Sequence, residues 1–279
     1  MLPAKSYPLK AVSFGLTAFP QSYIIVSETN DVEEETMREE LIRTEMLLGE
    51  RAMQKLAGAR VAVFGIGGVG GYAAEALVRS GIGAIDLIDN DTVSISNLNR
   101  QILSLHSTIG KYKVDVAAER FLDINPQLKI HCSKTFVLPE NISEFDFSNY
   151  NYVIDATDTV TAKICLIQKA RESDTPIISS MGTGNKLDPT KLQIADISKT
   201  SMCPLARVMR KELRARGINH LKVLYSTEEP LNVCAKSEPS PDSIDAQIIR
   251  RKNFPGSTAF VPPAGGLIIA SEVVRDLIR

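Results

Sequence analysis

A short apolar run that ends in closely spaced glycines constrains the fold of this chain more than any other feature. Residues 61–64 are apolar, and the pattern Gly-x-Gly-x-x-Gly follows at once, with Gly65, Gly67, Gly68 and Gly70. This spacing is typical of a strand that turns tightly into a helix, whose first N–H groups can bind a phosphate. A second apolar run, 84–88, ends at Asp89, where a ribose-binding acid is expected in a dinucleotide site. By itself the pattern predicts a bound nucleotide, with NAD as the first interpretation.

Polar side chains that a dinucleotide site does not require follow this acid closely. They are Asn97, Arg100 and Gln101, and Lys113 comes somewhat later. An arginine binds phosphate oxygens through a fork of N–H donors, whereas a lysine supplies a compact positive charge. Together these groups are suited to neutralise a triphosphate rather than to bridge a pyrophosphate, so the pattern favours ATP over NAD.

Two aspartates lie at the end of a third predicted strand. Asp155 and Asp158 close the segment 152–158, at the carboxyl edge where open α/β sheets bind their ligands. A carboxylate there suits Mg²⁺, which keeps several waters and needs few protein ligands. Each polar residue taken singly would also fit an exposed loop or a helix cap. Their joint position at strand ends favours a nucleotide and magnesium site.

These residues resemble the ATP site of the ThiF-type, or ubiquitin-activating, superfamily of adenylating enzymes. Ordered motifs carry the resemblance, namely residues 65–70, 89–91, 96–101, 110–113 and 155–158. The resemblance implies an ATP site formed by Gly65, Gly67, Gly68, Gly70, Asp89, Asp91, Asn97, Arg100, Gln101 and Lys113. Within it, Asp89 would bind the ribose, Asn97, Arg100, Gln101 and Lys113 the phosphates, and Asp158 the magnesium. Catalytic roles are implied for Arg100, Lys113 and Asp158.

A further arginine, Arg43, lies in the predicted N-terminal helix. It resembles the arginine that enzymes of this superfamily send into the ATP site of a partner subunit, and a fourth catalytic role is therefore implied for it. A homodimer follows from this resemblance. Arg38 lies close by, and the segment also fits an ordinary acidic amphipathic helix.

Strings beyond the ATP motifs resemble one branch of the superfamily, the tRNA threonylcarbamoyladenosine dehydratases. They are residues 80–83, 187–190, 196–200, 204–206 and 225–228, and the likeness extends over most of 37–279. The resemblance implies that the threonyl carboxylate of a modified adenosine in tRNA is adenylated by ATP. An intramolecular attack would then release AMP and cyclise the side chain, with net loss of water and no protein nucleophile.

Two other functions remain open from the sequence. One is adenylation of the C-terminal glycine of a ubiquitin-like sulfur-carrier protein, with transfer to Cys203. A sulfur-transfer protein is a separate candidate partner of the enzyme. The cysteines stand singly at Cys132, Cys165, Cys203 and Cys234, whereas carrier-activating relatives commonly have two C-x-x-C pairs. Such single thiols favour a reducing, cytoplasmic location. The other is an adenylating-fold scaffold that binds ATP without turnover.

The charge of the chain is nearly balanced, with a formal net charge of -1. This excludes a global attraction to nucleic acids or membranes, so such binding needs a local patch. Basic residues do gather at Arg207, Arg210, Lys211, Arg214 and Arg216, and again at 250–252. They fit a solvated helix surface or a contact with RNA phosphates. No apolar segment approaches the roughly 20 residues that span a bilayer.

Alternation of predicted strands and helices from residue 60 onward indicates the fold class. The pattern is typical of an α/β, Rossmann-like, doubly wound and mostly parallel sheet with a C-terminal extension. We expect one adenylating domain over 37–279, which begins with a helix over 37–56, and a flexible extension over 1–36. Prolines, serines and charges without periodicity predict a mobile loop over 229–263, followed by a closing helix over 264–277.

Overall fold

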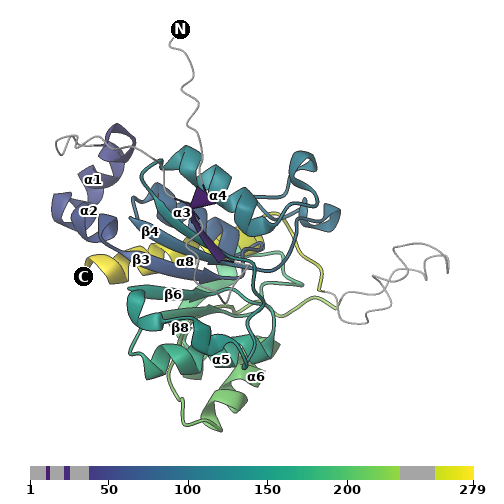
Figure 1. Cartoon of the computed structure of the whole chain (residues 1–279). Helices are drawn as coiled ribbons and strands as arrows, with labels where there is room; N and C mark the ends of the chain where they lie inside the picture. Colours follow the sequence, from purple (N-terminus) through teal and green to yellow (C-terminus); the bar gives the residue numbers. More distant parts are fainter. Residues whose placement is uncertain (1–10, 13–21, 26–37, 233–254) are drawn as a thin grey trace.

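The computed structural model describes residues 11–12, 22–25, 38–232 and 255–279. These residues form a twisted sheet with helices on both faces (Figure 1), which confirms the predicted α/β class. No helix among them is long and apolar enough to cross a membrane.

The sheet has nine strands in the described residues, in the order β1-β2-β5-β4-β3-β6-β7-β9-β8. Six of them, from β5 to β9 in this order, run parallel, and β8 and β2 add antiparallel strands at either side. Because β3 has β4 on one side and β6 on the other, the winding reverses there, and ligands bind at such a reversal. The strands are β1 Ala11–Val12, β2 Ser22–Ile25, β3 Arg60–Phe64, β4 Ala84–Ile88, β5 Lys129–Ser133, β6 Tyr152–Asp155, β7 Ile177–Ser180, β8 Leu192–Asp196 and β9 Lys222–Ser226.

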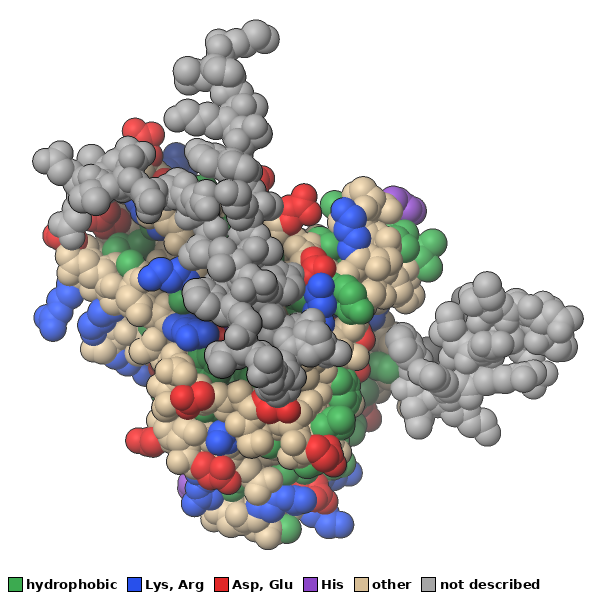
Figure 2. Space-filling model, viewed as in Figure 1, with side chains coloured by type: hydrophobic (Ala, Val, Ile, Leu, Met, Phe, Trp, Pro, Cys, Tyr) green, Lys and Arg blue, Asp and Glu red, His purple; other side chains and the backbone are tan. Residues whose placement is uncertain are grey.

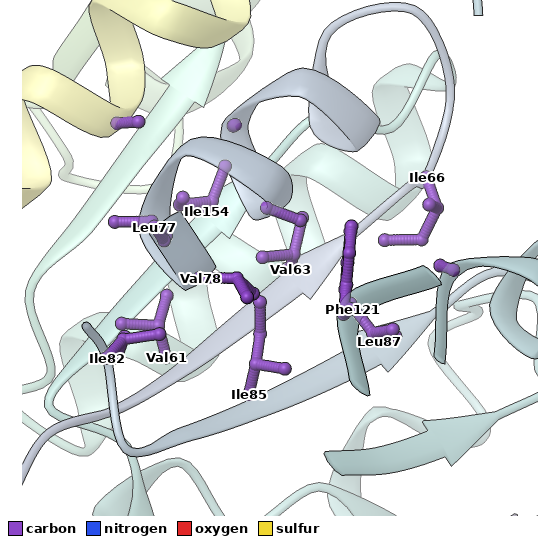
Figure 3. Close-up of a cluster of buried hydrophobic side chains, with 14 of the residues drawn as sticks. Val61, Val63, Ile66, Leu77, Val78, Ile82, Ile85, Leu87, Phe121 and Ile154 are labelled. Carbon is purple, nitrogen blue, oxygen red and sulfur yellow. The ribbon is translucent and has the colours of Figure 1, made fainter. Parts of the chain in front are cut away.

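The side chains of β3 alternate between two cores, as the period of a strand requires. Val61 and Val63 belong to the core beneath α3, α4 and α8 (Figure 3), whereas Ala62 and Phe64 belong to a second core beside α5. A third cluster packs α6 against β9. The helices are α1 Ile42–Leu48, α2 Glu50–Ala57, α3 Gly70–Arg79, α4 Lys113–Ile124, α5 Val160–Glu172, α6 Pro204–Arg214 and α8 Val261–Ile278, with short 3-10 turns between them.

An acid on β4 is buried in a polar cluster within this sheet. Asp86 accepts hydrogen bonds from Arg60 Nε at 2.7 Å and from Tyr150 Oη at 3.2 Å, and lies 2.9 Å from His131 Nδ1. Burial alone would raise the pKa of the Asp86 carboxyl, but the hydrogen bonds with His131 and Arg60 and their charges hold it below its ordinary value. The cluster therefore stabilises the ionised acid.

Three expectations about the ends of the chain need revision or restriction. The predicted single helix over 37–56 is two helices, because Gly49 adopts φ of +82° between α1 and α2. The parts of the 1–36 extension that are described are strands, and β2 pairs with β5. The predicted loop over 229–263 ends earlier, since α8 begins at Val261, and residues 233–254 lie outside the described residues. Prolines in its first turn are compatible with this earlier start.

Candidate active site

A cavity of about 640 Å³ opens at the carboxyl ends of β3, β4 and β6, where the winding of the sheet reverses. The structure brings most of the predicted site residues to its wall. Two of them do not line it, Gly70 and Arg43. Those that do are Gly65, Gly67, Gly68, Asp89, Asp91, Asn97, Arg100, Gln101, Lys113 and Asp158.

The glycine turn after β3 forms the floor of the cavity. Gly65 has φ of +89°, and a Cβ there would lie 2.6 Å from the carbonyl oxygen of Ala156, on the neighbouring strand end. A Cβ on Gly70 would lie 1.8 Å from the carbonyl oxygen of Gly65, so the first turn of α3 packs directly on the glycine turn. Gly67 is open, with no atom nearer to its Cβ position than Gln101 Nε2 at 3.7 Å. Gly70 thus shapes the site without lining it.

Asp89 connects the end of β4 to the glycine turn. Its Oδ2 accepts a hydrogen bond from the Ile66 N–H at 2.6 Å, and its Oδ1 accepts one from the Asp91 N–H at 2.8 Å. Burial raises the pKa of this carboxyl above its ordinary value, against the opposing charge of Lys113. The acid predicted to meet a ribose is therefore fixed in place at the cavity wall.

Lys113 is the first residue of α4 and is buried. Its Nζ donates to Asp91 Oδ2 at 2.6 Å and lies 3.8 Å from Asp89 Oδ2. The side chain of Asp91 is 61% exposed, so this ion pair lies at the open side of the ammonium group. A phosphate at the cavity would compete with Asp91 for Lys113.

The segment 97–101 supplies one cation and two amide side chains to the cavity wall. Arg100 Nη1 donates to the carbonyl oxygen of Ser96 at 2.9 Å and to Asn99 Oδ1 at 2.8 Å, and no carboxylate pairs with Arg100 among the described residues. Burial lowers the pKa of its guanidinium. Asn97 Oδ1 accepts from the backbone of Ser94 and so caps the turn. Gln101 Oε1 is buried without a hydrogen-bond partner in the described part of the chain.

The two aspartates at the end of β6 have different surroundings. Asp158 is exposed at the cavity wall, whereas Asp155 is fully buried beneath it. Asp155 pairs with Lys163 of α5 at 3.1 Å, and Lys163 Nζ also donates to the carbonyl oxygen of Ser180 at 2.7 Å. Thr157 Oγ1 donates to Asp155 as well. This network holds together the ends of β6 and β7, from which two walls of the cavity extend.

Lys163 was missed by the sequence analysis, although a signal was present. It stands on an apolar helical stripe with Leu166, Ile167 and Ala170, at the i, i+3, i+4 and i+7 positions. A lysine in such a stripe is buried only if it is paired. With Asp155 at the end of the preceding strand, the partner was also visible in the sequence.

The end of β7 and the loop after it also line the cavity, at residues 180–184, and were not predicted from the sequence. Asn185 follows this segment with φ of +58°. Its backbone N–H donates to the Gly256 carbonyl at 2.8 Å, its Oδ1 accepts from the Gly256 N–H at 2.6 Å, and its carbonyl accepts from the Leu231 N–H at 2.8 Å. Pro255 and Ser257, beside Gly256, line the cavity. Asn185 therefore joins two distant segments at this wall.

Two remaining candidates, Arg43 and Cys203, do not line the cavity. Arg43 is exposed on α1. Cys203 is only 3% exposed and packs in the apolar cluster beneath α6 with Met209 and Leu213, which does not suit an acyl-accepting thiol. Cys234 lies outside the described residues.

A model of the ThiF family matches residues 41–277, which is most of the chain. The chain belongs to the ThiF family. Among relatives of this ThiF-family chain, tRNA threonylcarbamoyladenosine dehydratase of Bacillus subtilis is 43% identical over 244 residues, which covers 87% of the chain and 96% of the relative. The enzyme of the same name from Escherichia coli is 45% identical over 172 residues, 62% of the chain and 64% of the relative.

Solved structures agree with this placement. A crystal structure of the Escherichia coli tRNA N6-threonylcarbamoyladenosine dehydratase in complex with ATP superposes with a TM-score of 0.76, at 34% identity over 88% of this ThiF-family chain and 96% of that structure. A complex of the same enzyme with AMP has a TM-score of 0.76 at 35% identity. The predicted superfamily and fold are therefore confirmed.

Proposed function

We propose that this protein is an ATP-dependent tRNA threonylcarbamoyladenosine dehydratase. The observation that carries the proposal is the cavity at the reversal of the sheet, because it collects nearly every residue that the sequence assigns to ATP. Similarity to dehydratases over most of the chain supports the same reading and disfavours a carrier-activating enzyme. The burial of Cys203 argues against thiol transfer as well.

Three structural features of the cavity suit a nucleoside triphosphate. The open position at Gly67 lets the start of α3 face a phosphate, whereas a side chain would fill that space. Arg100 has no carboxylate partner among the described residues, and Lys113 is held by an exposed one. The Oε1 of Gln101 is a buried acceptor without a partner among the described residues, and a hydroxyl or amino donor of the nucleoside would satisfy it.

We assign roles in keeping with these positions. Asp89 would accept from the ribose hydroxyls, with Asp91 beside it. The N–H groups of Gly67 and Gly68, the side-chain N–H groups of Asn97 and Gln101, and the cations Arg100 and Lys113 would bind the phosphates. Arg100 and Lys113 would neutralise charge that develops as pyrophosphate leaves, which is where electrostatic stabilisation accelerates such a step.

Mg²⁺ also fits the donor set, provided that phosphates supply part of its shell. The described residues contain no group of three or more metal-binding side chains, and Asp158 is a single exposed carboxylate at the cavity wall. This is the kind of ligand that Mg²⁺ uses with nucleotides. Asp158 would hold the ion, which would add positive charge beside the phosphates.

The reaction that we propose balances without a protein nucleophile. An oxygen of the threonyl carboxylate attacks the α-phosphate of ATP and forms a C–O–P linkage, and pyrophosphate leaves. A nucleophile in the same modified side chain then attacks the acyl carbon and expels AMP. The nucleoside loses the elements of one water molecule in total. In these steps the protein positions the carboxylate and neutralises charge.

Besides tRNA, we propose two protein partners: a second copy of this chain and a sulfur-transfer protein. Arg43 is exposed on α1 and does not line the cavity of its own chain, and in a homodimer it would reach the cavity of the partner subunit. Analytical ultracentrifugation of the full-length protein tests whether it forms a homodimer. Addition of a sulfur-transfer protein to the assay tests whether such a protein stimulates turnover.

Mass spectrometry of nucleosides tests the function. Native tRNA that carries threonylcarbamoyladenosine is incubated with the full-length protein, ATP and Mg²⁺, and then digested. We expect the modified nucleoside to lose the mass of one water molecule, and an R100A/K113A variant to leave it unchanged. An unchanged mass with the wild-type protein would refute the proposal, and pyrophosphate exchange that requires a carrier protein would support the alternative.

A further inference from the structure

Helix α6 begins beside the cavity and carries four basic residues, Arg207, Arg210, Lys211 and Arg214. Cys203 precedes its first turn and Leu205, within that turn, lines the cavity. A Cβ on Gly182, in the loop after β7, would lie 3.9 Å from Leu205 Cβ. The helix therefore connects the cavity wall with the surface beyond it.

Three cations form a continuous stripe on the exposed side of α6. Arg207, Lys211 and Arg214 occupy positions i, i+4 and i+7, which lie on one face of a helix, and all three are exposed. No acidic side chain pairs with any of them among the residues that the structure describes. The two other basic residues of this region do have partners within the chain. Arg210 donates to the Thr200 carbonyl at 2.8 Å, and Arg216 pairs with Glu212 at 2.8 Å. We call Arg207, Lys211 and Arg214 the α6 stripe.

The stability of the helix does not account for this arrangement. Like charges three and four residues apart, such as Arg207 with Lys211 and Lys211 with Arg214, destabilise a helix by about 0.2–0.5 kcal/mol per pair. Lys211 and Arg214 gain from the negative end of the helix dipole, but Arg207 lies near the positive end and does not. Repulsion that the fold leaves uncompensated indicates an anionic partner for the stripe.

We propose that the α6 stripe binds the phosphate backbone of tRNA while the target nucleoside enters the cavity. This inference rests on the proposed function for the identity of the nucleic acid. The three cations spread over roughly 10 Å along the helix, from its rise of about 1.5 Å per residue, and so present charge along a strand rather than at one phosphate. Figure 2 shows Lys and Arg side chains, with some acids among them, at the lower end of the molecule, where α6 lies in Figure 1.

Binding of an unmodified tRNA transcript over a range of salt concentrations tests the stripe. The full-length wild type is compared with R207Q/K211Q/R214Q and with a control of equal charge change, R51Q/R79Q/K129Q, on α2, α3 and β5. Each phosphate contact contributes about 0.7–0.9 to the slope of log K against log salt. We expect the stripe variant to reduce this slope by about 2 and the control to leave it unchanged. The variant R207K/K211R/R214K, which keeps the charges, should retain the wild-type slope.

Further readouts separate this inference from the proposed function. We expect the stripe variant to raise the KM for tRNA, while ATP affinity measured without tRNA stays at the wild-type value. A wild-type slope in the stripe variant, or an equal loss in the control, would overturn the inference even if the wild type dehydrates tRNA. A stripe-dependent slope without any dehydration would overturn the proposed function alone. Binding through the stripe of polyglutamate but not tRNA would assign it to an acidic protein and refute the RNA contact.

Discussion

Replacement of Gly70 by alanine tests whether the first turn of α3 and the glycine turn form one packed unit. The new Cβ would lie 1.8 Å from the carbonyl oxygen of Gly65 and 3.2 Å from Ala156 Cβ. Ordinary contact requires at least 3.4 Å, so either α3 or the glycine turn must move by roughly 1.5 Å. Movement of the turn also disturbs the hydrogen bond from the Ile66 N–H to Asp89.

The neighbouring glycine provides a matched control. A Cβ on Gly71 meets nothing nearer than Ile102 Cγ2 at 3.5 Å, which is an ordinary contact. Both glycines lie in the first turn of α3, so the helix preference for alanine is similar at the two positions. The difference between the two variants therefore reports the close contact with the Gly65 carbonyl alone.

We expect G70A to lower the free energy of unfolding by about 1–3 kcal/mol, as overpacked cores do, and G71A to leave it unchanged or raise it. Denaturant unfolding measures this difference. Since the displaced turn lines the cavity, titration calorimetry should show ATP affinity at least tenfold weaker in G70A, which corresponds to about 1.4 kcal/mol. A G70A protein that matches G71A in both stability and ATP affinity would refute the reasoning.

Three further predictions concern buried and strained groups. K163M leaves Asp155 unpaired and should lower the free energy of unfolding by about 3–5 kcal/mol in urea titrations, whereas K163M/D155N should recover part of the loss; wild-type stability of K163M would contradict this. The pKa of Asp86 in the folded protein lies below its unfolded value of 3.8. The stability that ionised Asp86 adds to the fold is therefore complete above pH 3.8 and is lost as the pH falls through the folded pKa. R60M should move acid unfolding, followed by circular dichroism, to higher pH, and an unchanged midpoint would exclude the pair as a contributor. Alanine and glycine both remove the Asn185 side chain, but only alanine has a Cβ that is strained at φ of +58°. The melting temperature of N185A should therefore fall below that of N185G, and the reverse order would reject backbone strain as the cause.

The sequence predicted the central sheet and the ATP side of the cavity because both depend on local patterns. The predicted strands 61–64, 84–88 and 152–155 each end at or directly before a motif residue, namely Gly65, Asp89 and Asp155, and parallel strands bring those ends together without further information. In these elements the local preference of the chain and its tertiary packing agree.

The remaining features depend on contacts between segments far apart in the chain. Gly70 was predicted to belong to the ATP site, and its close packing on Gly65 becomes visible only from the distance between the two residues in the fold. Asn185 holds Leu231 and Gly256, which no spacing rule connects. Pairing of β2 with β5 likewise joins residues about a hundred positions apart, and a short run of 22–25 carries little periodicity. The roles of Arg43 and Asp158 stay predictions, because they concern a partner subunit and a metal ion.

The fate of the carboxylate oxygens tests the central claim most directly. Native tRNA in which both oxygens of the threonylcarbamoyl carboxylate are ¹⁸O is incubated with the full-length protein, ATP and Mg²⁺ in ordinary water. The released nucleotide is analysed by mass spectrometry. Attack of the carboxylate on the α-phosphate predicts AMP that carries one ¹⁸O atom, with one label retained in the dehydrated nucleoside. Unlabelled AMP, or release of ADP in its place, would contradict adenylation of the carboxylate.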